Sequence, residues 1–124
     1  MILVDANVVL RYLLKDIADQ ADQAKSIIAE NQVNVLLGVL AEVVYVLSGV
    51  YEVPRKEIAD ILIGFGNLDN VIYEQESIAF RALTAFSDNN IDFIDGILYS
   101  YHVLGVAEIM SFDKKLNTLL LGNR

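Results

Sequence analysis

The sequence predicts an α/β fold, a three-layer α/β/α sandwich around a mainly parallel central sheet of four to five strands. Two observations support this prediction. Short apolar runs, typical of buried strands, alternate along the chain with longer segments whose apolar residues recur at helical spacing. Strands that are apolar throughout, separated by helices, indicate parallel pairing with helices on both faces of the sheet.

The order of elements follows from these runs and from capping residues. We expect strands at 2–4, 33–37, 71–73 and 107–111. We expect helices at 8–14, 19–30, 39–50, 55–65, 76–86 and 93–104, with a last short helix starting near residue 113. Asn7 and Asp19 can cap their helices, Asp92 lies near the start of another, Pro54 suits a first turn, and Gly105 ends a helix. Residues 116–124 can form a helix or a very short edge strand.

Length and composition limit the classes of protein. The 124 residues suit one domain, 1–124, and a hydrophobic share of 55% allows a sizeable core. Cysteine is absent and His102 is the single histidine, which excludes thiolate and multi-histidine metal sites. Any metal must therefore be a hard, oxygen-ligated cation such as Mg²⁺ or Mn²⁺. The formal net charge of −8 argues against direct binding of duplex DNA.

One apolar segment, 33–51, is nearly long enough to span a bilayer. It has Glu42 at its centre, and a central carboxylate is costly in lipid, so a buried strand followed by a buried helix explains it better. No basic region precedes an apolar stretch at the start, and we expect a cytoplasmic protein without membrane contact.

Four acidic residues fall where the expected parallel strands end or where the following helices begin. They are Asp5, Glu42, Asp95 and Asp113. Ligands of parallel sheets bind beyond the carboxyl ends of the strands. Asp95 and Asp113 could each be helix-capping acids, and Asp5 could be a turn residue. Glu42 has no capping role, and its apolar neighbours in sequence indicate a buried carboxylate, which is costly unless it is paired or bound to metal.

The opening V-D-A-N-V-V-L-R-Y-L-L resembles the D-x-N start of the PIN-domain (PilT N-terminus) nucleases. Glu42, D-F-I-D-G-I-L around Asp95 and S-F-D around Asp113 are similar to the family's other acids in order and spacing. The resemblance covers essentially the whole chain, and the length is like that of the VapC-type toxins of toxin–antitoxin pairs. It implies a PIN-like α/β/α nuclease domain over 1–124, a Mg²⁺ or Mn²⁺ site, cleavage of single-stranded RNA, a homodimer and a cognate antitoxin.

The roles of the acids follow from phosphodiester hydrolysis, in which a divalent ion can activate water and neutralise developing charge. Asp5 and Asp95 are the expected principal ligands. Glu42 would bind through water or position the attacking water, and Asp113 would complete the site. Asn7 and Ser111 would orient the carboxylates, although a turn hydroxyl explains Ser111 about equally well.

Four basic residues flank these acids in sequence and could bind RNA phosphates: Arg11, Lys15, Lys114 and Lys115. The alternative is that they are solubilising charges paired with Asp16 or Asp19. The function expected first is a metal-dependent endoribonuclease. The others are a PIN-like module that binds metal or RNA or dimerises without turnover, and a different Mg²⁺ phosphotransferase. Asn7 argues against the last, because it stands where such enzymes need a second aspartate.

Overall fold

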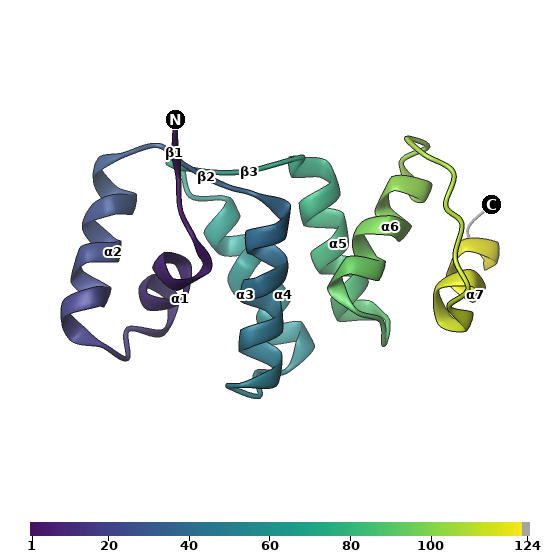
Figure 1. The fold of residues 1–124 in the computed structure, drawn as a ribbon, viewed down its shortest axis with the longest axis horizontal. Coiled ribbons are helices and arrows are strands. Elements are labelled where there is room, and N and C mark those ends of the chain that lie inside the picture. The colour runs from purple at the N-terminus through teal and green to yellow at the C-terminus, as the bar shows by residue number, and fades with distance from the viewer. Residues whose placement is uncertain (123–124) are drawn as a thin grey trace.

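The computed structural model describes residues 1–122, which form a mixed α/β structure (Figure 1). In this part of the chain the elements are β1 (Ile2–Leu3), α1 (Ala6–Leu14), α2 (Ala18–Glu30), β2 (Val33–Val35), α3 (Leu37–Gly49), α4 (Arg55–Gly66), β3 (Val71–Tyr73), α5 (Glu76–Asp88), α6 (Phe93–Val103) and α7 (Lys114–Gly122). The expected α/β class is confirmed, with a parallel sheet and an arrangement consistent with an α/β/α fold. The last two residues of the expected domain, 123 and 124, lie outside the described residues.

The sheet has the strand order β1-β2-β3, with both pairings parallel. Ile2 pairs with Val33, and Val33 pairs with Val71, so β2 is the central strand. In β2 and β3 the outer residues of each strand are buried, whereas the central residues Asn34 and Ile72 are half-buried. One face of the sheet therefore carries the core, and the opposite face is more open.

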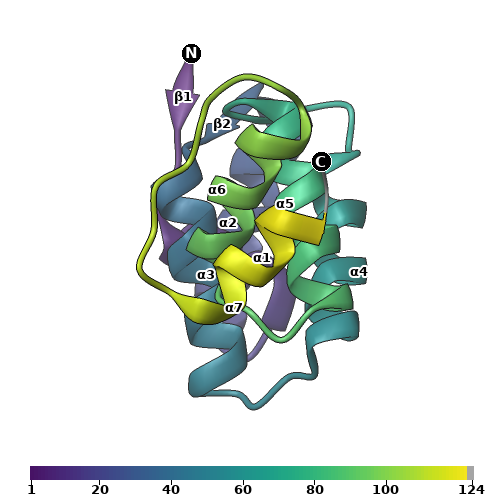
Figure 2. The ribbon, with the colours of Figure 1, turned by 90° about the vertical axis from the view of Figure 1, so that its right-hand side faces the viewer.

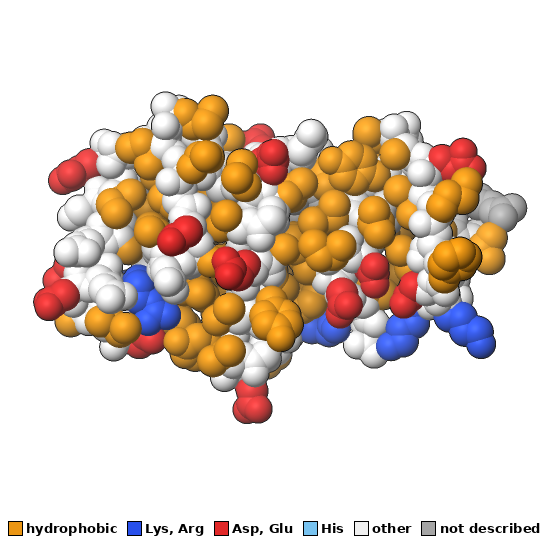
Figure 3. Space-filling model, in the orientation of Figure 1, with side chains coloured by type: hydrophobic (Ala, Val, Ile, Leu, Met, Phe, Trp, Pro, Cys, Tyr) orange, Lys and Arg blue, Asp and Glu red, His pale blue; other side chains and the backbone are white. Residues whose placement is uncertain are grey.

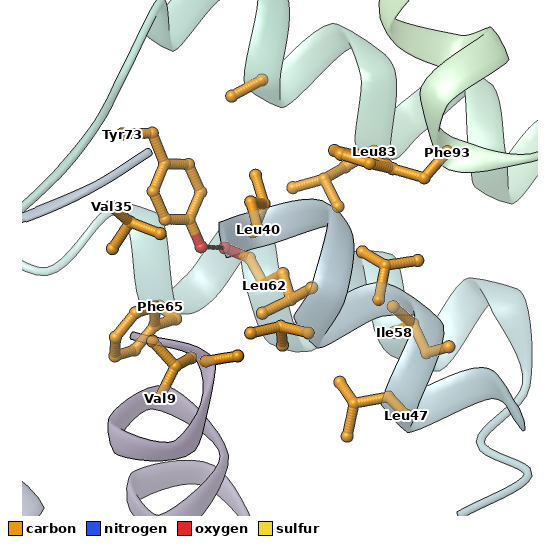
Figure 4. Close-up of a cluster of buried hydrophobic side chains, with 14 of the residues drawn as sticks. Val9, Val35, Leu40, Leu47, Ile58, Leu62, Phe65, Tyr73, Leu83 and Phe93 are labelled. Atoms are coloured by element: carbon orange, nitrogen blue, oxygen red, sulfur yellow. Dashed lines mark hydrogen bonds between the residues drawn. The ribbon is translucent and has the colours of Figure 1, made fainter. Parts of the chain in front are cut away.

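The core joins the sheet to α1, α3, α4 and α5 (Figure 4). Leu62 and Tyr73 lie at its centre, and the Tyr73 hydroxyl donates a 2.6 Å hydrogen bond to the Leu62 carbonyl. This bond satisfies the polar end of a ring that is otherwise buried among apolar side chains. Gly66 lies against the same ring, and a Cβ atom there would overlap Tyr73. The close approach of α4 to β3 thus requires glycine at this position.

The strand expected at 107–111 is wrong. Residues 106–113 have no regular secondary structure, and within residues 1–122 the sheet has three strands instead of four or five. The physical reason is position: this segment follows α6 at one end of the molecule, well apart from β1 (Figures 1 and 2). A strand needs a neighbouring edge, and the described part of the chain gives this segment none.

Two helix starts also differ from expectation. Asp5, and not Asn7, caps α1, because the Asp5 carboxylate accepts a 3.0 Å hydrogen bond from the Val8 amide. Asp19 lies in the first turn of α2, after an N-cap at Ile17. The start of α6 at Asp92 is confirmed. Gly105 follows its end with φ +69°, a left-handed conformation that favours glycine.

Among the helices described, none combines the length and the apolar character needed to cross a bilayer.

Candidate active site

Asp95 and Asp113 share a surface hollow of about 270 Å³ at the junction of α6 and α7. Asp95 lies in the first turn of α6, and Asp113 immediately precedes α7. Asp92, the N-cap residue of α6, lines the same hollow. Asp92 and Asp95 lie one turn apart, whereas Asp113 is distant from both in sequence. The packing of α7 on α6 places these three carboxylates along one hollow.

Hydrogen bonds fix the position of Asp113. Its carboxylate accepts a 2.8 Å hydrogen bond from the Leu116 amide, which makes it the side-chain cap of α7. Its own amide donates to the Ser111 hydroxyl at 2.9 Å. The Asn117 side chain donates to the Ser111 carbonyl at 2.8 Å. The Ser111 hydroxyl therefore contacts the Asp113 backbone and not its carboxylate, which is the turn contact that the sequence left open as the alternative.

Ionisation of Asp95 is unfavourable in this hollow. The pKa of Asp95 is raised above its ordinary value, first because burial penalises the carboxylate, and then because Asp113 and Asp92 carry like charges nearby. A cation would relieve this repulsion. Asp92 is a residue that the sequence interpretation treated as a helix start only, although the spacing D-F-I-D places it one turn from Asp95.

Asp5 lies in a different hollow, of about 320 Å³, between α1 and α2. Asn7 and Arg11 line the same space, so the expected supporting residue Asn7 is near Asp5. Asp5 is exposed and its carboxylate caps α1, which gives it a structural role whatever else it binds.

Glu42 is exposed, and the expectation that it is a buried carboxylate is wrong. The buried residues of α3 are Leu40, Val43, Val44 and Leu47. This i, i+3, i+4, i+7 stripe faces the core, and Glu42 shares the outer face with the exposed Tyr45. The apolar neighbours in sequence therefore do not surround the Glu42 side chain.

The acids lie in separate groups within one chain. Figure 3 shows acidic side chains over α1 and α3, and another group over α6 and α7, with hydrophobic surface between them. Within residues 1–122, no three Asp, Glu or His side chains come close enough to hold a metal ion. Carboxylates are the right donors for Mg²⁺, but a single chain in this arrangement supplies too few at one place, so the fit to a metal is incomplete.

The basic residues divide in the same way. Lys114 and Lys115 line the hollow of Asp95 and Asp113, where they form a positive rim beside the carboxylates. Arg11 instead forms a salt bridge to Asp16 at 3.0 Å and a long hydrogen bond to the Tyr51 hydroxyl. Lys15 ends α1 in a left-handed conformation and lines a different hollow from Asp5.

Arg55 is a further residue that the sequence interpretation did not single out. Its guanidinium donates to the carbonyls of Phe86 at 3.0 Å and Ile91 at 2.6 Å, and lies over the Phe86 ring. It ties the start of α4 to the loop between α5 and α6, beside Asp92. Carbonyl partners of this kind leave no sequence signal, because they depend only on the path of the backbone.

The chain belongs to the PIN-domain family, since the family model matches residues 2–119. PIN domains are generally metal-dependent hydrolytic nucleases and typically bind divalent metals such as Mg²⁺. No curated protein and no solved structure matches the chain.

Proposed function

We propose that this PIN-domain protein is a metal-dependent endoribonuclease that cleaves single-stranded RNA. Its acidic residues would be Asp5, Glu42, Asp95 and Asp113, with Mg²⁺ or Mn²⁺ as the cofactor. The observation that carries the proposal is the hollow where Asp95 and Asp113 meet with two lysines at its rim. Carboxylates that repel one another attract a divalent cation, and adjacent lysines attract phosphate.

The negative charge of the protein favours RNA over duplex DNA as substrate. With a net charge of −8, the chain has little surface that could neutralise two phosphate backbones. Lys114 and Lys115 form a small local patch that suits a single strand. Lys15 and Arg11 would add to it less, because Arg11 is already paired with Asp16.

A second function is favoured by a specific observation. Because the acids lie in separate groups within residues 1–122, the chain could instead bind metal or RNA, or dimerise, without turnover. An active nuclease requires the groups to act together, whereas a binding module does not.

We also propose that the protein is the toxin of a toxin–antitoxin pair. A groove of about 360 Å³ between α3 and α6 is lined by Val44, Phe93 and Ile94, and Tyr45 at its side is exposed. An apolar groove of this kind suits an antitoxin segment as partner. A small neighbouring gene whose product has a DNA-binding N-terminus and copurifies with this chain would support this role.

The experiment for the main proposal uses single-stranded RNA with Mn²⁺, with Mg²⁺ and with chelator. Wild type is compared with Asp5→Asn, Glu42→Gln and Asp95→Asn. Asp60→Asn is the matched control, because Asp60 is an exposed acid paired with Lys56 on α4. We expect metal-dependent cleavage that is lost in the first and third variants, reduced in the second and retained in the control. RNA binding that tightens with metal, without cleavage, would favour the binding module.

A further inference from the structure

The groove between α3 and α6 adjoins the acidic hollow at the junction of α6 and α7. The groove has a volume of about 360 Å³, and Asp92 is one of the residues that line it. Asp92 also lines the hollow of Asp95 and Asp113. A ligand in the groove would therefore lie next to the hollow that the proposed function assigns to an RNA phosphate. The volume falls within the range of about 300–1,000 Å³ that is usual for small-ligand pockets.

The walls of the groove are apolar and aromatic. Val44, Phe86 and Phe93 contribute to them. Tyr45 and Ile94 also line the groove, although 75% and 53% of their surfaces are exposed. Figure 3 shows hydrophobic surface between the acidic side chains over α3 and those over α6 and α7. An exposed aromatic ring beside apolar side chains is a surface on which a flat nucleobase stacks.

Arg55 brings hydrogen-bond donors to the groove and is held in place there. Its Nη1 atom donates to the carbonyls of Phe86, Asn89 and Ile91 at 3.0, 3.3 and 2.6 Å. Its Cζ atom lies 4.3 Å from the centre of the Phe86 ring. Within residues 1–122, Nε and Nη2 of Arg55 donate no hydrogen bond. The guanidinium is thus fixed in the groove wall and keeps donors for a ligand.

Asp92 brings acceptors that the rest of the protein leaves unused. It is the N-cap residue of α6, yet its carboxylate accepts no hydrogen bond from the amides of the helix. The side chain is exposed, and it forms no salt bridge with any residue of 1–122, Arg55 included. A carboxylate and a guanidinium that line one groove without pairing can offer acceptors and donors to the same ligand.

The polar edge of guanine matches these two groups. Guanine is the one common RNA base with adjacent N–H donors, on N1 and N2, and a carboxylate can accept from both. Guanine also has the acceptors O6 and N7, to which arginine donates. Adenine and cytosine have a ring-nitrogen acceptor next to the amino group, and uracil has a carbonyl on each side of its single donor. Each of these three bases would set an acceptor against the Asp92 carboxylate.

We propose that the groove between α3 and α6 is a guanine-binding subsite for single-stranded RNA. Asp92 accepts from N1 and N2 of the base, Arg55 donates to its O6, and Tyr45 stacks on its face. The proposal rests on the proposed RNA substrate but not on cleavage. If the adjoining hollow holds the neighbouring phosphate, cleavage falls beside a guanosine. The proposed antitoxin segment would occupy the same groove and exclude the base.

The test measures RNA binding in the presence of chelator, so that cleavage does not interfere. Fluorescein-labelled single-stranded RNAs contain uridine throughout, except for one central guanosine, inosine, adenosine or cytidine. Fluorescence anisotropy at low salt gives each Kd. We expect the guanosine RNA to bind at least about fivefold more tightly than the adenosine and cytidine RNAs, the low end for a bidentate contact. Inosine lacks the N2 amino group, so the inosine RNA should bind more weakly than the guanosine RNA.

Substitution of Asp92 separates base recognition from a structural effect. Asp92→Asn replaces the carboxylate by a carboxamide, which has one acceptor and one donor and suits adenine. We therefore expect the variant to lose the guanosine preference and to bind the adenosine RNA at least as tightly. Asp88→Asn removes the same charge from an exposed position at the end of α5 and should keep the guanosine preference.

Substitution of Tyr45 tests the stacking contact. Tyr45→Ala should weaken the binding of all four RNAs by about fivefold or more, because stacking does not depend on the base. Tyr45→Phe keeps the ring and should retain binding. Equal weakening by both substitutions would overturn the stacking role of Tyr45.

The outcomes separate the subsite from the nuclease function. Equal affinity for the four RNAs, or a guanosine preference that persists in Asp92→Asn, would overturn the subsite. Binding that depends on Tyr45 but not on the base would also overturn it, and would leave the groove to a protein partner. A guanosine preference without cleavage in Mn²⁺ or Mg²⁺ would support the subsite and contradict the nuclease. Absence of binding to every RNA would contradict both.

Discussion

The sheet with its helices and the α6–α7 end of the molecule differ in how they are stabilised. Around the sheet, a contiguous core runs from Val4, just after β1, to α5 and includes Phe93 of α6 (Figure 4). In contrast, α7 buries only Leu116 and Leu120, and segment 106–112 exposes Val106, Met110 and Phe112. This end of the molecule therefore exposes an apolar patch, whereas the sheet region buries its large apolar side chains.

The largest effect should come from the difference between a buried side chain and an exposed one. Leu62→Ala removes a fully buried side chain, and we expect the free energy of unfolding to fall by about 2–5 kcal/mol. Phe112→Ala removes a larger but fully exposed side chain and should change it by less than about 0.5 kcal/mol in the dilute monomer. Urea unfolding at low protein concentration measures both. Equal losses would mean that segment 106–112 is packed within its own chain.

A smaller effect should come from the joint between the two regions. Gly96→Ala places a Cβ about 3.0 Å from the Ala82 carbonyl, where the backbone cannot easily move. We expect a loss of about 1–3 kcal/mol and weaker protection of α6 amides in hydrogen exchange. Gly64→Ala is the control, because a Cβ there meets open space and alanine favours the helix by up to about 1 kcal/mol. Stabilisation by both substitutions would show that α6 is not closely packed on α5.

The capping acids allow structure and function to be separated. Asp113→Ala removes the cap of α7 and should cost about 1 kcal/mol, whereas Asp113→Asn keeps an oxygen for the Leu116 amide and should cost little. Both remove the carboxylate, so both should lose cleavage. Thermal unfolding and the RNA assay, run side by side, measure the two roles. Full cleavage by Asp113→Asn would exclude Asp113 from the site.

The smallest effect concerns the charge coupling at the junction of α6 and α7. Because the Asp113 carboxylate raises the pKa of Asp95, Asp113→Asn should lower that pKa toward its ordinary value. The ionised form of Asp95 then persists to lower pH. Carbon-13 chemical shifts of the Asp95 carboxyl, followed through a metal-free titration, measure the change. Asp88→Asn, in the last turn of α5, is the control and should leave the pKa unchanged. An unchanged pKa in Asp113→Asn would mean that the two carboxylates are not close in solution.

Sequence alone predicted the elements whose signals are local. The helices and the first three strands carry their own apolar pattern, so their order and type were correct. The strand at 107–111 was wrong because strand formation depends on a neighbouring edge, which no local pattern encodes.

Two of the predicted site residues, Asp95 and Asp113, border one hollow, since they lie at adjoining helix starts. Their role in a metal site stays a prediction. Glu42 was misread because its neighbours along the sequence are apolar, whereas the helical period turns it 100° away from the buried Val43. The distance between Asp5 and Asp113 depends on where α6 and α7 pack, and that packing is a tertiary property.

The central claim is that the two groups of acids serve one metal site, and Mn²⁺ tests it directly by paramagnetic broadening of amide signals. The reporters are Val8, whose amide donates to Asp5, and Leu116, whose amide donates to Asp113. We predict that both signals broaden together over the same range of Mn²⁺ concentration, and that Asp113→Asn removes the effect at both. Broadening of the two signals at different Mn²⁺ concentrations would contradict a shared site. So would undiminished broadening of the Val8 signal in Asp113→Asn.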